Sequence, residues 1–154
     1  MVLEKGQCFL ADGKCDRSMK IGPILLIRDT GSGSLPKALI EKAAKGIYER
    51  ERIPNARKTH VIFCSDHAIA RLNLTFRGKK HATDVLSFNY NDNDLLGEIY
   101  ISLQRVRVQA RQYGVSYSNE IVRLFVHGMH HLLGFDHEKP GDRKKMEAAE
   151  SRYL

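Results

Sequence analysis

The stretch Thr59-His-Val-Ile-Phe-Cys-Ser-Asp-His-Ala-Ile-Ala-Arg-Leu-Asn-Leu-Thr-Phe76 changes character at its centre, and the change indicates the fold class. Apolar and β-branched residues dominate from Thr59 to Cys64, which is typical of a buried strand. Ser65 or Asp66 then offers a helix N-cap, and a helix is predicted to extend to about Phe76. A strand followed directly by a helix is typical of a domain that mixes the two.

The same signals, applied to the rest of the sequence, predict four strands and five helices. The strands are predicted at 21–27, 59–64, 83–89 and 97–103, and the helices at 35–52, 65–76, 103–113, 116–133 and 140–153. We therefore predict a single α/β (α+β) domain over residues 21–154, in which a mixed, mostly parallel four-stranded sheet is packed with about five helices. Residues 1–20 show no useful periodicity and are predicted to form a flexible leader.

The composition favours a basic protein of the cytoplasm. The net charge is +7 and the pI about 9.4, which favours polyanionic partners such as nucleic acid or anionic lipid. No window approaches the ~20 apolar residues that span a bilayer, and the first twenty residues contain no apolar signal-peptide core. The cysteines, an odd number, have no close pairing, as expected in a reducing compartment. We therefore expect no membrane partner.

Four of the seven histidines lie within the segment His127-Gly-Met-His-His-Leu-Leu-Gly-Phe-Asp-His137. His127 and His131 are four residues apart on a predicted helix, so their rings project from one face and can converge on one ion. Gly134 ends the helix, and His137 can then return as a third ligand. Three imidazoles leave a fourth position open for water, which is typical of a catalytic zinc site. We predict one Zn²⁺ per chain, although nickel or cobalt would also suit three imidazoles.

Two neighbours of these ligands receive different interpretations. His130 points about 100° away from His131 around the helix, so it is interpreted as a bystander. Asp136 either orients an imidazole ligand through a hydrogen bond or favours the turn, and both alternatives stay open.

The histidine and glycine spacing equals that of the zinc proteases with the pattern His-Glu-x-x-His-x-x-Gly-x-x-His. The glutamate of that pattern is the general base of peptide hydrolysis, and Gly128 stands in its place. The glycine argues against peptide hydrolysis by that route.

The same segment resembles the signature of the bacterial YbeY family. The matching residues are His127-Gly-x-x-His131-x-x-Gly134-x-Asp136-His137. Further segments resemble the family in the same order, and these are Leu72-Asn73 with Phe76-Arg77, Thr83-Asp-Val-Leu-Ser-Phe88 and Gly97-Glu-Ile99. The resemblance covers about residues 60–138.

The resemblance implies a zinc-dependent, single-strand-specific endoribonuclease of 16S rRNA 3′-end maturation and ribosome quality control. The implied partners are single-stranded RNA, 16S rRNA and the ribosome or its small subunit, and no nucleotide cofactor is expected. By the same resemblance, His127, His131 and His137 hold the metal, and Arg77 is a functional arginine.

A nuclease must activate a nucleophile and stabilise negative charge at phosphorus. We expect the metal site, with His127, to serve the first task, through water or hydroxide that attacks or acts as base. Arg77 is expected to bind the scissile phosphate, because a guanidinium forks onto phosphate oxygens. Without the resemblance, Arg77 would be read as an ordinary solvated residue. Lys79 and Lys80 extend the basic loop and are expected to follow the RNA backbone.

The run Thr83–Phe88 is expected to edge the active cleft. Alternation puts Val85 and Ser87 on one face of the strand, with Leu86 and Phe88 on the other. Ser87 or Asp84 is expected either to contact the substrate, for which Ser87 is the candidate, or to hold the loop that carries Arg77, and the two roles stay open.

Two other functions stay open on the sequence. One is a zinc-dependent hydrolase of peptides or small molecules, and the other is a non-catalytic ribosome-binding protein with a zinc site. A structural zinc site normally needs a fourth protein ligand, and the sequence offers no clear one.

Overall fold

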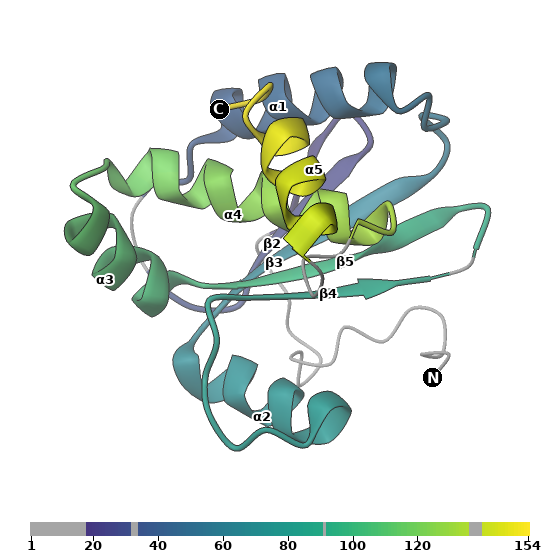
Figure 1. The fold of residues 1–154 in the computed structure, drawn as a ribbon. Coiled ribbons are helices and arrows are strands. Elements are labelled where there is room, and N and C mark those ends of the chain that lie inside the picture. The colour runs from purple at the N-terminus through teal and green to yellow at the C-terminus, as the bar shows by residue number, and fades with distance from the viewer. Residues whose placement is uncertain (1–17, 32–33, 91, 136–139) are drawn as a thin grey trace.

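The structure is a computed structural model that describes residues 18–31, 34–90, 92–135 and 140–154. Its strands form one sheet in the order β1-β2-β3-β5-β4 (Figure 1). The strands are β1 (Ser18–Ile21), β2 (Ile24–Arg28), β3 (Lys58–Cys64), β4 (Val85–Asn89) and β5 (Leu95–Ser102). The helices are α1 (Lys37–Arg50), α2 (Asp66–Arg77), α3 (Leu103–Tyr113), α4 (Tyr117–Leu132) and α5 (Pro140–Glu150).

The sheet is mixed, as predicted, but it has five strands instead of four. Strands β2, β3 and β5 are parallel in its centre, while β1 and β4 pair antiparallel at its two edges. The predicted single α/β domain is therefore confirmed for its fold class, and the expectation of a mostly parallel sheet holds only for the three central strands.

The additional strand comes from the start of the described chain, where the prediction of one strand over 21–27 was wrong. Ile21 and Ile24 are paired across a two-residue hairpin loop. Gly22 has a φ of +57°, which glycine adopts without strain and which suits the first loop position of a type II′ turn. Strand β1 begins at Ser18, so residues 18–20 of the predicted leader belong to the sheet. Residues 1–17 lie outside the described residues.

Serine caps start three of the helices. The side chains of Ser65, Ser102 and Ser116 each accept a hydrogen bond from a backbone N–H in the first turn of α2, α3 and α4, respectively. Gly78 and Gly114 end α2 and α3 in the left-handed conformation that glycine tolerates best. Local sequence therefore sets the bounds of these helices, close to where they were predicted.

Two apolar cores hold the helices on opposite faces of the sheet. The larger core packs Ile47 of α1 and Phe125 of α4 against strand residues such as Ile99. The smaller core packs Ile69 of α2 against Tyr100 and its neighbours on the other face. Figure 1 shows the result, with α1, α4 and α5 on one side of the sheet and α2 on the other. Helix α4 contacts β4, β5, α1, α3 and α5 and is thus the central helix.

None of the helices in the described ranges combines the length and the apolar composition that a membrane span requires.

Candidate metal site and its surroundings

Helix α4 carries the histidine pair, and local sequence determines where it ends. Gly134 has a φ of +88° directly after the helix. Its N–H donates to the carbonyl of His131 at 3.0 Å, and the N–H of Phe135 donates to the carbonyl of His130 at 3.0 Å. These two bonds form a Schellman motif, which satisfies carbonyls that a helix end leaves without partners. The motif directs the chain toward residues 136–139, which lie outside the described residues.

The imidazoles of His127 and His131 converge. Their Nε2 atoms are 3.1 Å apart, and the ring planes lie at 82° to one another. Two nitrogens of a zinc tetrahedron with bonds of about 2.0–2.1 Å are separated by about 3.4 Å. The pair therefore fits two ligands of one ion after a shift of a few tenths of an ångström. The predicted third ligand, His137, falls outside the described residues, and among the residues that are described no group of three metal-ligating side chains forms.

Gly128 allows α4 to touch the sheet directly beneath the histidine pair. A Cβ atom at this position would lie 2.6 Å from Ile99 Cγ2 and 3.1 Å from Ser87 Oγ. Real Cβ atoms essentially never make a contact as short as the first. The glycine that replaces the protease glutamate thus has a packing role, because no side chain fits there. The same contact places Ser87 of β4 on the α4 side of the sheet, as the predicted alternation requires.

A second glycine extends this close contact to the last turn of α4. A Cβ atom at Gly97 of β5 would overlap the carbonyl oxygen of Phe88 and would lie 2.6 Å from the Leu132 side chain. The Asn89 Nδ2 donates to the carbonyl oxygen of Leu132, which the helix leaves without an internal partner. Helix α4 is therefore held against β4 and β5 at Gly128, within the turn that carries the histidine pair, and at Leu132, directly after it.

Glu150 of α5 stands behind the first histidine of the pair. Its Oε1 lies 2.7 Å from Nδ1 of His127, on the opposite side of the ring from the Nε2 that faces His131. Glu150 could not be identified from the sequence, because the two partners are 23 positions apart on separate helices and α5 carries no motif. Asp136, which the sequence offers as a candidate orienting carboxylate, lies outside the described residues.

His130 does not belong to the pair. It is fully buried, and its Nδ1 donates to the carbonyl of Val126 at 2.8 Å. Its ring packs edge-on against Phe135, with the ring centroids 5.3 Å apart. The structure thus places His130 in the apolar interior, in agreement with its interpretation as a bystander.

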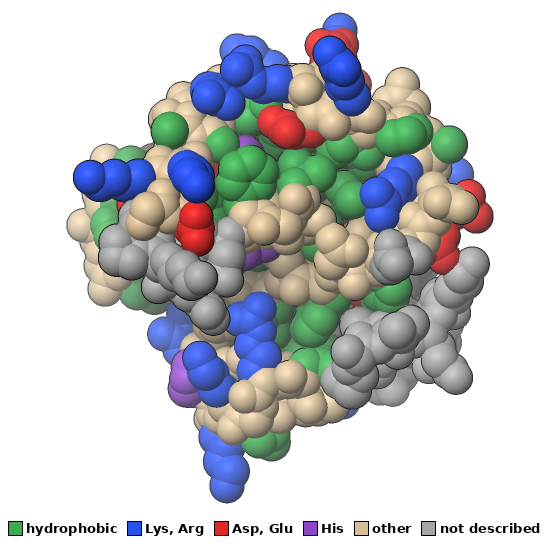
Figure 2. Space-filling model, turned by 45° about the vertical axis from the view of Figure 1, so that its right-hand side comes forward, with side chains coloured by type: hydrophobic (Ala, Val, Ile, Leu, Met, Phe, Trp, Pro, Cys, Tyr) green, Lys and Arg blue, Asp and Glu red, His purple; other side chains and the backbone are tan. Residues whose placement is uncertain are grey.

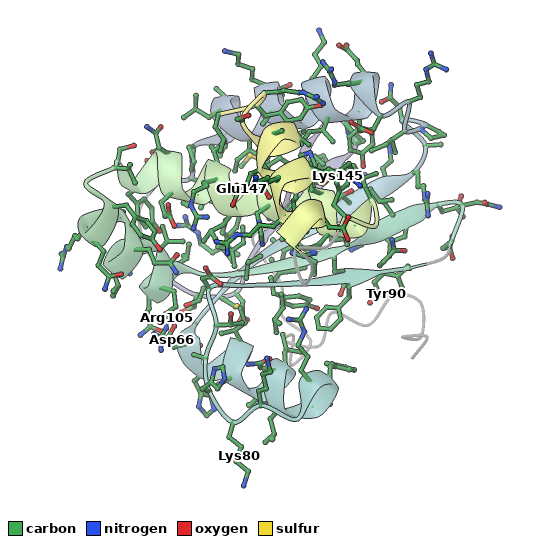
Figure 3. The ribbon with its side chains drawn as sticks, in the orientation of Figure 1. Asp66, Lys80, Tyr90, Arg105, Lys145 and Glu147 are labelled. Atoms are coloured by element: carbon green, nitrogen blue, oxygen red, sulfur yellow. The ribbon has the colours of Figure 1, made fainter. Side chains whose placement is uncertain are left out.

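The predicted basic residues lie on the other layer of the molecule. Arg77 is the last residue of α2, and Lys79 and Lys80 follow it; all three are exposed. Figure 3 shows Lys80 pointing away from the sheet below α2. Because α2 and α4 cover opposite faces, these cations and the histidine pair are separated by the sheet and lie on either side of its β4 edge. In Figure 2, histidine surface is recessed in a hollow with Lys and Arg side chains on the surface below it.

Comparison with known proteins assigns the chain to a family. The family model described as Endoribonuclease YbeY matches residues 31–154. The chain belongs to the YbeY family. Among its relatives, the protein named Endoribonuclease YbeY from Chloroflexus aggregans is 42% identical over 129 residues, which cover 76% of this chain and 84% of the relative. The Endoribonuclease YbeY of a Roseiflexus species is 40% identical over 129 residues, covering 76% and 81%.

The fold agrees with the same assignment. The solution structure of a Thermotoga maritima protein superposes with a TM-score of 0.56 at 31% identity, and the match covers 84% of each chain. The YbeY-family resemblance predicted from the histidine segment is therefore confirmed. The individual roles remain predictions for His127, His131, His137, Asp136, Arg77, Lys79, Lys80 and Ser87.

A cavity of about 880 Å³ lies elsewhere on this YbeY-family chain. Its walls come from α1, the N-terminal half of α4 and the end of the chain, and include Leu39, Val122 and Tyr153. Neither His127 nor His131 lines it. The candidate site is thus defined by converging side-chain chemistry and not by this cavity.

Proposed function

We propose that this chain cleaves single-stranded RNA as a zinc-dependent endoribonuclease, in 16S rRNA 3′-end maturation and ribosome quality control. As a member of the YbeY family, the chain is an endoribonuclease involved in rRNA processing, and thus a hydrolase that acts on RNA. The preference for single strands and the association with 16S rRNA and the ribosome or its small subunit are proposals. The net charge of +7 supports a polyanionic partner.

The observation that carries the proposed metal chemistry is the 3.1 Å approach of the Nε2 atoms of His127 and His131. Both would hold the ion, and His137, which follows the Gly134 turn, is proposed as the third ligand. Zinc bound there supplies Lewis acidity toward a phosphate oxygen and lowers the pKa of a water molecule. The proposed catalytic role of His127 is therefore to hold and orient the metal.

We propose that Arg77 binds the scissile phosphate of the RNA. A guanidinium stays charged at every working pH and donates two parallel hydrogen bonds to phosphate oxygens. Lys79 and Lys80 would bind the neighbouring phosphates of the RNA backbone, and Ser87 would contact the RNA near the metal. Because β4 is the edge strand between the α2 and α4 layers, an RNA strand laid across this edge would meet both the cations and the histidine pair. A folded duplex is a poorer fit for such a path than a flexible single strand.

Hydrolysis of peptides is the weaker alternative. The zinc proteases of matching spacing use a glutamate next to the first histidine as general base. Here that position is Gly128, and contact with Ile99 leaves no room for a side chain. The packing thus disfavours a protease-like mechanism more strongly than the absence of the glutamate alone.

The cytoplasm is the proposed compartment. Cys64 is buried, and its thiol donates to the carbonyl of Ile101 at 3.7 Å. The odd number of cysteines in the sequence is typical of a reducing compartment. Cys8 and Cys15, which contributed to this expectation, lie outside the described residues.

The test is cleavage of labelled single-stranded and duplex RNA of equal sequence by the purified full chain, with bound metals measured by elemental analysis. We expect bound zinc and cleavage of the single strand that a chelator abolishes. His131→Ala should lose both the zinc and the cleavage. His67→Ala, which removes an exposed histidine on α2, should retain both.

Contaminating ribonuclease is controlled by purifying the variants in parallel. Equal RNA cleavage by wild type and His131→Ala would overturn the proposed role of the histidine pair. Cleavage of casein instead of RNA would favour the peptide hydrolase, while bound zinc without either activity would favour the ribosome-binding alternative.

A further inference from the structure

We infer that Glu150 is a positioning residue for His127, so that α5 sets the metal affinity of a site that lies on α4. The inference rests on the proposed metal site. It adds to that site a residue outside the histidine segment, and it makes a helix without any metal-ligand motif a part of the metal-binding unit.

The contact geometry assigns the proton on the imidazole. A carboxylate oxygen only accepts hydrogen bonds, so at 2.7 Å the His127 Nδ1 must carry the hydrogen that it donates to Glu150. In the neutral ring, Nε2 then keeps its lone pair, and this is the atom that lies 3.1 Å from His131 Nε2. Glu150 therefore selects the tautomer in which the ligand atom faces the proposed metal position.

The surroundings make this contact stronger than an ordinary surface pair. The His127 and Glu150 side chains are only 23% and 14% exposed, so water screens the interaction less than it screens an exposed pair. Carboxylates that hold the second nitrogen of a metal-ligating histidine fix the ring orientation and raise its basicity. Their loss typically lowers metal affinity about 10–100-fold.

Helix α5 does not depend on Glu150 for its attachment. Met146 and Ala149 of the same helix are buried, at 2% and 5% exposure, and anchor it by apolar contact. Removal of the carboxylate should therefore leave α5 in place, and its effect on metal binding can be separated from an effect on folding.

A matched control lies one turn earlier on the helix. Glu147 is also a glutamate of α5, but its side chain is 61% exposed and pairs with Arg143 at 3.0 Å. Figure 3 labels Glu147 on the same helix, together with the exposed Lys145. Glu147→Ala removes the same charge from the same helix without touching His127.

The first measurement is zinc affinity of the full-length chain, by competition with a chelating dye. We expect Glu150→Ala to weaken zinc binding about 10–100-fold. Glu150→Gln, which keeps an oxygen acceptor for Nδ1, should recover most of the loss, and Glu147→Ala should bind as wild type does. The thermal midpoint of unfolding of each variant, measured without metal, checks that the fold is intact.

The second measurement needs no metal. Nitrogen chemical shifts of the imidazoles in the metal-free chain report which ring nitrogen is protonated, and His127 should be protonated at Nδ1 in wild type and Glu150→Gln but mixed in Glu150→Ala. Unchanged zinc affinity and tautomer in a folded Glu150→Ala chain would overturn the inference. If instead the wild type itself binds no zinc, the proposed metal site fails, and the tautomer measurement still decides whether Glu150 orients His127.

Discussion

Replacement of Gly128 by alanine tests whether α4 rests on the sheet through a backbone contact. The added Cβ would lie 2.6 Å from Ile99 Cγ2, and Ile99 is a fully buried β-branched residue of β5 that has no space to turn aside. Overpacking of this kind costs about 1–3 kcal/mol. Alanine also gains up to about 1 kcal/mol over glycine in a helix interior. We therefore expect a net loss of about 0–2 kcal/mol in the free energy of unfolding.

The assay is urea unfolding at 25 °C with chelator present, so that metal binding does not add to the stability of the folded state. The matched control is Gly141→Ala in α5, because a Cβ there meets nothing within 4 Å and should be neutral or stabilising. A Gly128→Ala chain that is stabilised as much as the Gly141→Ala chain would refute the packing argument. Gly128→Glu, which restores the protease pattern, should prevent folding instead of creating peptide hydrolysis.

Three further predictions concern the site, a helix cap and a buried tyrosine. Arg77→Ala should lower RNA cleavage about 100-fold while the zinc content stays unchanged, and normal cleavage would remove the proposed phosphate contact. Ser65→Ala removes the oxygen that accepts from Ala68 N at 3.1 Å, so urea unfolding should show a loss of about 0.5–2 kcal/mol, and no loss would contradict the cap. Burial raises the pKa of Tyr48 above its ordinary 10.0, although the hydrogen bond to Thr59 lowers it in part. The neutral phenol therefore stabilises the folded state below pH 10, and this contribution is lost as pH rises through the folded-state pKa. Tyr48→Phe should cost about 1 kcal/mol near pH 8 and reduce the decline in stability above pH 10, as unfolding from pH 8 to 11 can show.

The elements that could be predicted from sequence are those with local signals. Ser116 and Gly134 marked both ends of α4, and the spacing of His127 and His131 placed the two rings on one helix face. The first hairpin was missed although Gly22 lies within it, because the apolar residues on both sides of the glycine looked like one continuous strand.

The parts that could not be predicted depend on contacts between distant segments. Glu150 reaches His127 only because α5 folds back over α4. The position of Arg77 on the face of the sheet opposite α4 could not be predicted from the sequence either. The handedness rule for crossovers between parallel strands does not apply to α2, because this helix leads into β4, which pairs antiparallel with its neighbour. From the sequence, Gly128 was informative only as the position where the zinc proteases have a glutamate. Its packing role depends on Ile99 of β5, whose position beneath α4 no local signal indicates.

The two glycine contacts beneath α4 also affect how the molecule moves. The backbone at Gly97 and Gly128 packs directly against the buried side chains of Leu132 and Ile99. Packing this close leaves little room for the helix and the sheet to slide past one another. The contact of α4 with β4 and β5 beneath the histidine pair should therefore be among the last parts of the chain to unfold. Amide hydrogens of α4 around residue 128 are then expected to exchange with solvent only through global unfolding, while those of α5 exchange faster. An enzyme built in this way would keep the proposed metal-binding face rigid, and adaptation to RNA would fall to the layer across the β4 edge.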